Sequence, residues 1–163
     1  MLTRILSVVF MLLFLAACGS TPKDESAGDS SGDLTSVDYT SDGIRAGSAE
    51  DLIINVGDRV FFELNSHELS SDAKELLQDQ ASWLKQYSNV EVTIEGHCDE
   101  RGTREYNIAL GERRAQAMKN YLIGLGIVAD RLSTISYGKE RPAVLGSNDA
   151  AWDQNRRAVA VVN

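Results

Sequence analysis

Arg114 is the charged residue whose position in the sequence most needs an explanation. When the helix predicted over residues 105–125 is drawn at 100° per residue, Arg114 falls on its apolar side, four residues after Leu110. A guanidinium on a buried face is costly unless it is paired and hydrogen-bonded. Either its stem packs at the edge of the apolar stripe while its head reaches water, or an anion lies next to it.

The loop just before this helix, residues 96–104, contains two candidate anions, Asp99 and Glu100. In one interpretation a loop carboxylate pairs with Arg114, and in another Arg114 awaits the carboxylate of a ligand. A carboxylate and a guanidinium side by side present both signs of charge. Such a pair suits a zwitterionic ligand such as an amino acid.

The same loop also allows an enzymatic alternative, in which His97 and Asp99 are metal ligands of a cell-wall hydrolase. Two ligands are fewer than the three that a catalytic zinc usually takes from a protein. His67, the only other histidine, has no ligand spacing to them. We therefore expect no catalytic residue, no metal and no cofactor, and we interpret both histidines as loop residues.

The beginning of the chain reads as a targeting segment. Arg4 precedes an apolar run from Ile5 to Leu15, which is shorter than the roughly 20 residues that span a bilayer. The sequence Leu-Ala-Ala-Cys that ends at Cys18 resembles the bacterial lipobox, whose cysteine is acylated and becomes the mature N-terminus. We expect a signal peptide over residues 1–17 and a covalent lipid on Cys18, with two or three acyl chains forming a stable anchor.

A flexible acidic tether is expected over residues 18–51. From residue 19 onward it holds eight acidic and two basic side chains among many Ser, Gly, Thr and Asp. This composition cannot bury enough apolar surface to offset the entropy lost on ordering. It accounts for most of the formal charge of −8, which also argues against a nucleic-acid binder.

Residues 52–163 are predicted to form one α+β domain with the order β-α-β-α-β-β. Runs of apolar and β-branched residues predict the strands, and in residues 90–95 apolar and polar residues alternate. Ser70 and Ser71, followed by apolar residues at helical spacing, predict the start of the first helix. Helices on one face of the sheet would give a two-layer domain. The strands are expected near 59–64, 90–95, 132–137 and 156–162, the helices near 70–87 and 105–125, and a short helical turn near 148–154.

Several of these segments together resemble the OmpA-like family of peptidoglycan-binding domains, and within it the peptidoglycan-associated lipoproteins. The resemblance covers about Val60 to Val162, and the lipobox and tether fit it. Four sequence segments carry it: Gly-His-Cys-Asp-Glu-Arg-Gly-Thr from Gly96, Asn-Ile-Ala-Leu-Gly-Glu-Arg-Arg-Ala from Asn107, Ser136–Gly146, and Asn155–Val159.

The resemblance implies a mixed sheet and a ligand, the diaminopimelate of the peptidoglycan stem peptide. It assigns Arg114 to a ligand carboxylate through two hydrogen bonds, and Asp99 to the ligand backbone, loop contacts and charge balance. Asn107 and Leu110 match the positioning residues at the helix start. Asn65 stands where related proteins often have Asp, and we include it in the site.

The resemblance also implies a place for the protein in the cell. It implies an outer-membrane lipoprotein with a periplasmic domain that links the membrane to peptidoglycan, with the periplasmic protein TolB and the Tol complex as partners. Supporting envelope integrity and cell division is the expected role. The alternative is a generic OmpA-like lipoprotein outside the Tol–Pal system.

Two further expectations concern residues near the site. The Asn155-Arg156-Arg157 segment is predicted to brace the last strand rather than touch ligand. Cys98 departs from the usual Ala, Thr or Asn, and with Cys18 blocked by lipid it would be unpaired. It is either shielded or paired between molecules.

Overall fold

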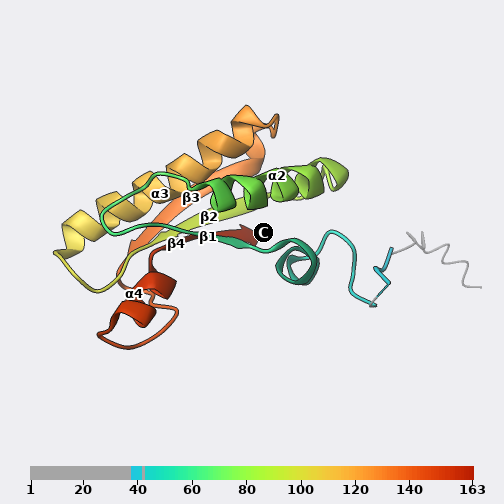
Figure 1. Ribbon diagram of the computed structural model, residues 1–163. Helices are drawn as coiled ribbons and strands as arrows, with labels where there is room; N and C mark the ends of the chain where they lie inside the picture. Colours follow the sequence, from blue (N-terminus) through green and yellow to red (C-terminus); the bar gives the residue numbers. More distant parts are fainter. Residues whose placement is uncertain (1–37, 42) are drawn as a thin grey trace, which may run out of the picture. The chain divides into compact units, whose positions relative to one another are not determined.

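Four strands form one mixed sheet in the order β1-β4-β2-β3. The structure, a computed structural model, describes residues 38–41 and 43–163. β2 runs parallel to β3, whereas β4 runs antiparallel to both β1 and β2. The predicted mixed sheet is therefore confirmed (Figure 1). The strands are β1 (Arg59–Phe61), β2 (Val92–His97), β3 (Leu132–Gly138) and β4 (Arg157–Val162).

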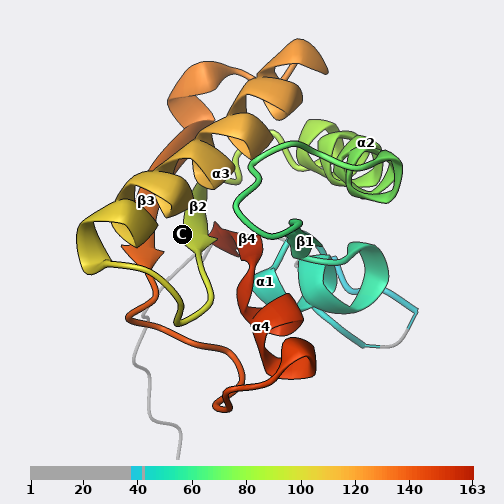
Figure 2. The ribbon, with the colours of Figure 1, turned by 60° about the vertical axis from the view of Figure 1, so that its left-hand side comes forward.

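Two long helices, α2 (Ser71–Gln86) and α3 (Arg104–Gly124), lie over the same face of the sheet (Figures 1 and 2). Each helix begins where the sequence supplies a capping side chain. Ser70 accepts a hydrogen bond from the amide of Ala73, and Thr103 accepts one from the amide of Tyr106. This arrangement confirms the predicted two-layer α+β domain.

The core lies between this helix layer and the sheet. Strand alternation turns Val92 and Ile94 of β2 toward the helices, where they are buried against Met118 and Leu122 of α3. The apolar stripe of α3 is thus buried as the periodicity predicts.

Two glycines let α3 approach β2 unusually closely. A Cβ placed on Gly96 would lie 1.9 Å from the carbonyl oxygen of Gly111, and one placed on Gly111 would lie 2.3 Å from Oγ of Ser136. No side chain fits between the helix and the strand at this point. The first turns of α3 are therefore held directly beside the end of β2.

The tether expected up to residue 51 ends earlier than the sequence indicated. Residues 49–51 form a single helical turn, α1 (Ala49–Asp51), which continues as one turn of π-helix at Leu52–Val56. Asp51 is buried and accepts hydrogen bonds from the amide of Gly47, Nδ2 of Asn55 and Nε1 of Trp83. These bonds fix part of the expected tether to α2.

Three smaller differences concern where elements begin and end, and one additional turn. β1 ends at Phe61 rather than at residue 64, and β2 is shifted by two residues toward the Asp99 loop. A short 3-10 turn, Ala129–Arg131, precedes β3, and the expected turn before the last strand is α4 (Asp149–Asn155).

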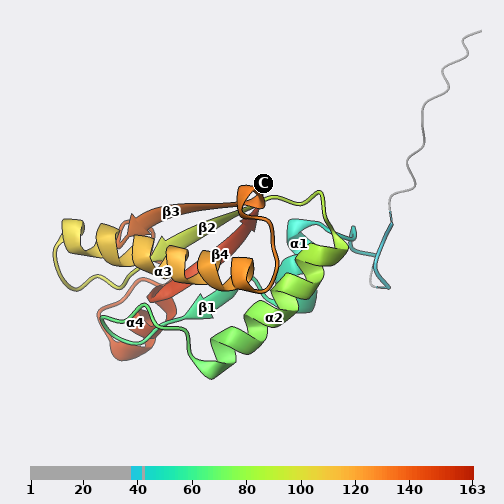
Figure 3. The ribbon, with the colours of Figure 1, turned by 90° about the horizontal axis from the view of Figure 1, so that it is seen from above.

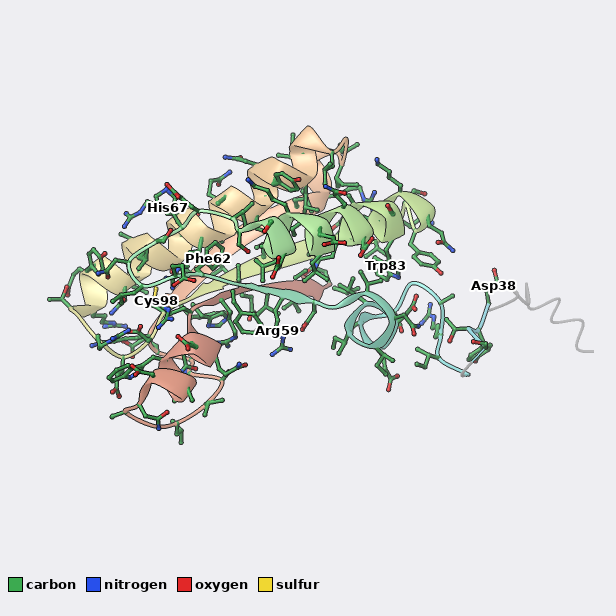
Figure 4. All side chains as sticks on the ribbon, in the orientation of Figure 1. Asp38, Arg59, Phe62, His67, Trp83 and Cys98 are labelled. Atoms are coloured by element: carbon green, nitrogen blue, oxygen red, sulfur yellow. The ribbon has the colours of Figure 1, made fainter. Side chains whose placement is uncertain are left out.

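The N-terminal segment and the Asp99 loop lie at opposite ends of the domain. Asp38 and Cys98 mark these two ends in Figure 4, and in Figure 3 α1 lies toward one end of the domain and α4 toward the other. No helix among the described residues is long and apolar enough to span a bilayer. The predicted signal peptide, Cys18 and the tether up to residue 37 lie outside the described residues.

Candidate functional site

A small pocket lies at the end of the domain where β2 runs into α3. The empty space within it and at its mouth, where it opens to solvent, amounts to about 220 Å³. All five residues that the sequence singled out line it, although they come from three separate stretches of chain. The lining residues are Leu64, Asn65, Cys98, Asp99, Arg101, Asn107, Leu110, Arg114 and Arg156.

Asp99 is buried in this pocket between two arginines. Its carboxylate accepts hydrogen bonds from the backbone amide, Nε and Nη2 of Arg101, at 3.0, 3.2 and 2.6 Å, and a longer one of 3.4 Å from Nη1 of Arg156. Burial alone would raise the pKa of Asp99, but the hydrogen bonds and charge of Arg101, with Arg156, outweigh it and lower the pKa. Asp99 is therefore a carboxylate at neutral pH.

Arg101 is held on a second side by the indole ring of Trp152 from α4. Its guanidinium carbon lies 4.0 Å from the centre of that ring. Nε1 of Trp152 donates to Oε1 of Glu100 at 3.1 Å, which fixes the ring against the loop. Sequence reasoning did not assign Arg101 to the site.

Arg114 has no exposed surface at all, so its head does not reach water. It also makes no ion pair with a described carboxylate. Instead Nε donates to the carbonyl of Ser66, Nη1 to that of His97 and Nη2 to that of Glu63, at 2.8, 2.8 and 3.1 Å. The expectation that Arg114 grips a carboxylate through two hydrogen bonds does not fit this geometry, because Nη2 retains only one hydrogen without a described acceptor.

Arg114 is thus a clamp between two segments that form the pocket. Its donors join the loop after β1 to the end of β2, and the ring of Phe62 lies 5.2 Å from its guanidinium carbon. Helical periodicity could not reveal this role, because the acceptors are backbone carbonyls far away in the sequence. Its positive charge nevertheless lies at the pocket.

Asn107 and Leu110 occupy the first turns of α3, as expected. Nδ2 of Asn107 donates to the carbonyl of Arg101 at 2.8 Å, so Asn107 fixes the Asp99 loop. Leu110 is buried and supplies an apolar wall. Asn65 has a positive φ of 55° and accepts a hydrogen bond from the hydroxyl of Tyr106 at 3.3 Å.

The Asn155-Arg156-Arg157 segment has a divided role. Asn155 and Arg157 brace the loop before α4, because Asn155 bonds to Ala143 and Val144 and Arg157 donates to the carbonyl of Arg141. Arg156, however, lines the pocket, where it donates to the carbonyl of Phe62 and to Asp99 and pairs with Asp153. The expectation that this whole segment only braces the strand is corrected for Arg156.

His97 and Asp99 are each engaged in other contacts. Among residues 38–41 and 43–163, no three His, Cys, Asp or Glu side chains gather closely enough to hold a metal ion. His97 is 2% exposed and stacks on Tyr137, whereas Asp99 is paired with arginines. Burial, followed by the charge of Arg157, lowers the pKa of His97 to about 4. His97 is therefore a buried strand residue rather than the loop residue expected.

Cys98 is shielded, which decides between the two alternatives left open. It is 3% exposed, and its thiol donates to the carbonyl of Asn107 at 3.3 Å. Burial raises the pKa of the thiol. A disulfide between molecules would require this side chain to leave its place.

The charges of the pocket favour an anion. Three guanidinium groups, those of Arg101, Arg114 and Arg156, lie around the single carboxylate of Asp99. Because Asp153 pairs with Arg156 from outside the lining, about one positive charge is left uncompensated in a partly desolvated place, where a carboxylate is bound more strongly than on an open surface.

The chain is similar to known proteins over most of its length. Residues 61–158 match the OmpA family. The peptidoglycan-associated lipoprotein of Brucella melitensis is 46% identical over 95% of this chain and 89% of its own length, and that of Agrobacterium fabrum is 46% identical over 99% and 89%.

Solved structures show the same fold. The crystal structure of the peptidoglycan-associated lipoprotein from Burkholderia pseudomallei is 40% identical, with a TM-score of 0.64 over 65% of this chain and 90% of that one. The C-terminal domain of Helicobacter pylori MotB, at 21% identity and a TM-score of 0.61 over 65% and 84%, shares the fold. The chain therefore belongs to the OmpA family and, within it, to the peptidoglycan-associated lipoproteins.

Proposed function

We propose that the Asp99 pocket binds peptidoglycan non-covalently by the diaminopimelate of the stem peptide. One observation carries the proposal: Asn65, Asp99, Asn107, Leu110 and Arg114, which are scattered over 50 positions of the sequence, meet in one positively charged pocket. The free end of diaminopimelate in a stem peptide carries both a carboxylate and an ammonium group. The ligand carboxylate can pair with the guanidinium groups, and its ammonium group can pair with the carboxylate of Asp99.

The proposed attachment to the membrane is a lipid on Cys18, in the outer membrane and with the domain in the periplasm. The lipobox-like sequence supports it, and so do the names of the relatives, which are lipoproteins. With one end in the membrane and the other on peptidoglycan, the protein would link the two layers. This is a binding and structural role, without catalysis.

The proposed partners are TolB and the Tol complex, in support of envelope integrity and cell division. The support is the close similarity to peptidoglycan-associated lipoproteins over nearly the whole chain. TolB and peptidoglycan would compete for the surface around the Asp99 loop. A pull-down with TolB in which added sacculi reduce recovery supports this, whereas capture of sacculi without any TolB binding favours a lipoprotein outside the Tol–Pal system.

Sedimentation with purified sacculi tests the binding function. We expect the wild-type domain to pellet and Asp99→Ala to remain in the supernatant, because the variant loses the group that holds Arg101 and Arg156 in place. Asp130→Ala, an exposed change in the 3-10 turn before β3, is the matched control and should pellet. Equal pelleting of Asp99→Ala and wild type contradicts the site, and failure of wild type to pellet contradicts the function.

A further inference from the structure

One edge of the sheet carries backbone groups that no described residue satisfies. β1 is the outermost strand on one side of the sheet, and it pairs only with β4. The amide of Ala160 in β4 donates to the carbonyl of Asp58, just before β1. Because the direction of the hydrogen bonds alternates along an antiparallel pair, the N–H and C=O groups of Arg59 and Phe61 point away from β4, to the outside of the sheet.

A groove runs along this edge, between β1 and the first turns of α2. The empty space within it and at its mouth amounts to about 540 Å³, inside the range of roughly 300–1,000 Å³ that ligand sites have. Ala73 and Leu76 of α2 supply apolar wall, and Phe61, which is 43% exposed, also lines the groove. Figure 3 shows β1 at the edge of the sheet with α2 beside it. The groove thus joins unpaired backbone groups to apolar side chains, the two features that an added strand uses.

A second groove continues the first beyond the end of β1. Phe61 and Ser70 line both grooves, and the second is lined also by Glu63 and Glu68. Both glutamates are exposed, and neither forms an ion pair with a described residue. The arginine of this second groove, Arg156, already pairs with two carboxylates. The edge of β1 therefore leads to uncompensated negative charge, which favours a basic partner.

A single extended chain fits this edge better than a second copy of the domain. A second β1 that paired antiparallel with this one would carry its own α2 on the same face of the sheet, where this α2 already lines the groove. An edge strand of three residues also offers few hydrogen bonds, and short edges are one way in which sheets avoid joining each other. A single strand brings no helix layer, and it gains apolar contact with α2.

We propose that the edge of β1 binds an extended, basic segment of a partner protein, which adds a strand to the sheet. The segment pairs with the backbone of Arg59 and Phe61 and places alternate apolar side chains against α2. A lysine or arginine at its end reaches Glu63 and Glu68. This surface lies beside β1 and α2, whereas the Asp99 pocket lies where β2 meets α3.

Hydrogen exchange followed by NMR on the whole chain tests the proposal with a synthetic peptide, acetyl-Lys-Thr-Val-Thr-Val-Thr-Lys-amide. Threonine and valine alternate in it, and a lysine at each end allows either strand direction to reach the glutamates. We expect the amides of Arg59 and Phe61 to exchange about tenfold more slowly or less at saturating peptide. The amide of Val60, which faces β4, is the internal control and should keep its rate.

Two N-methylated peptides separate strand addition from simple burial in the groove. One carries the methyl groups on its threonine amides and the other on its valine amides, so each lacks one set of donors. With the valines against α2, an antiparallel strand directs the threonine amides to β1, and a parallel strand directs the valine amides there. Methylation of one set should therefore abolish binding while methylation of the other does not. Equal effects of the two methylations overturn strand addition.

The charge of the groove is tested with a peptide that has glutamate in place of both lysines. We expect this peptide to bind about 3- to 10-fold more weakly, the range of a few exposed ion pairs. The double variant Glu63→Gln, Glu68→Gln should remove most of this difference. Asp130→Asn, an exposed acid in the 3-10 turn before β3, is the matched control and should keep it. An unchanged difference in the double variant contradicts the assigned role of the two glutamates.

Three other results would overturn the proposal. The first is protection of the Arg59 and Phe61 amides without peptide, growing with protein concentration, which would mean that a second copy occupies the edge. The second is a change at the amides of Arg101 and Asn107 instead, which would place the peptide in the Asp99 pocket. The third is no change at any amide up to the solubility limit of the peptide.

Discussion

Trp83 donates its indole N–H to the buried carboxylate of Asp51 across 2.9 Å, joining the last turn of α2 to α1. Asp51 accepts two further hydrogen bonds, from Gly47 and Asn55. Burial on its own would raise the pKa of Asp51, but these three bonds outweigh burial and lower it. The pair fixes the point at which the chain enters the domain.

Trp83→Phe should therefore destabilise the domain by about 1–3 kcal/mol, because a buried charged acceptor loses one donor while the aromatic packing on Tyr87 remains. Urea unfolding followed by circular dichroism measures this. Trp152→Phe, which changes an indole partly open to solvent at the other end of the domain, is the control and should cost less. Equal costs for the two variants contradict the importance of the Asp51 contact.

Gly96→Ala should destabilise the domain by about 3 kcal/mol or more, since the new methyl group would overlap the backbone of Gly111 and push α3 away from β2. Gly124→Ala is the matched control, because nothing lies within 4 Å of a Cβ placed there. This second change should be neutral or slightly stabilising. Thermal melts of both variants test the close packing, and similar melting temperatures contradict it.

Arg114→Ala should lower both stability and binding to sacculi. It leaves the carbonyls of Glu63, Ser66 and His97 without their donor, and we expect a loss of about 3 kcal/mol or more. Arg113→Ala, the neighbouring exposed arginine, is the control and should change stability little. Unfolding curves decide the matter: a variant as stable as Arg113→Ala would show that Arg114 is not a structural clamp.

The stability of the domain should fall as the pH decreases from about 6.5 to 4 because of His97. Its folded pKa of about 4 lies below its usual value of 6.5, so in this range the unfolded chain binds a proton that the folded domain does not. The contribution of neutral His97 to the free energy of unfolding is fully present above pH 6.5. By pH 4 about 3 kcal/mol of this contribution is lost.

Urea unfolding at several pH values tests this, with His97→Phe as the comparison. The variant should show a flatter dependence between pH 6.5 and 4. Below pH 4 both proteins should lose stability together, because the lowered pKa values of Asp51 and Asp99 then come into play. Parallel curves for the two proteins between pH 6.5 and 4 would contradict the role of His97.

Cys98 should resist thiol reagents in the folded domain. Its thiol is buried and has a raised pKa, so little reactive thiolate is available. We expect reaction with a disulfide reagent to be at least tenfold slower in buffer than in denaturant, with no disulfide-linked dimer on a non-reducing gel. Rapid labelling of the folded protein would show that the loop opens readily.

The sequence predicted the two layers of the fold because these follow from local patterns. Each of these patterns involves residues that are close in the sequence. They are the alternation of apolar and polar residues in 90–95, the apolar stripe around Leu110 and the helix cap at Ser70. The motif around Asp99 and Asn107 also pointed to the residues that meet in the pocket.

What the sequence could not show are contacts between distant segments. The donors of Arg114 find carbonyls 17 to 51 positions away, and Arg156 reaches Phe62 across 94 positions. The guanidinium of Arg101 stacks on the ring of Trp152, which lies 51 positions later in the sequence and in a different element. Such relationships depend on the folded arrangement and leave no periodicity in the chain.

The opposite placement of the N-terminal segment and the pocket has a mechanical consequence. β1 starts at the end where the chain enters the domain, and the loop that follows it reaches the pocket. Under the proposed function, a pull between the membrane anchor and the bound cell wall would run along the strands. The hydrogen bonds between β1 and β4 would then be loaded in shear and resist together rather than opening one after another.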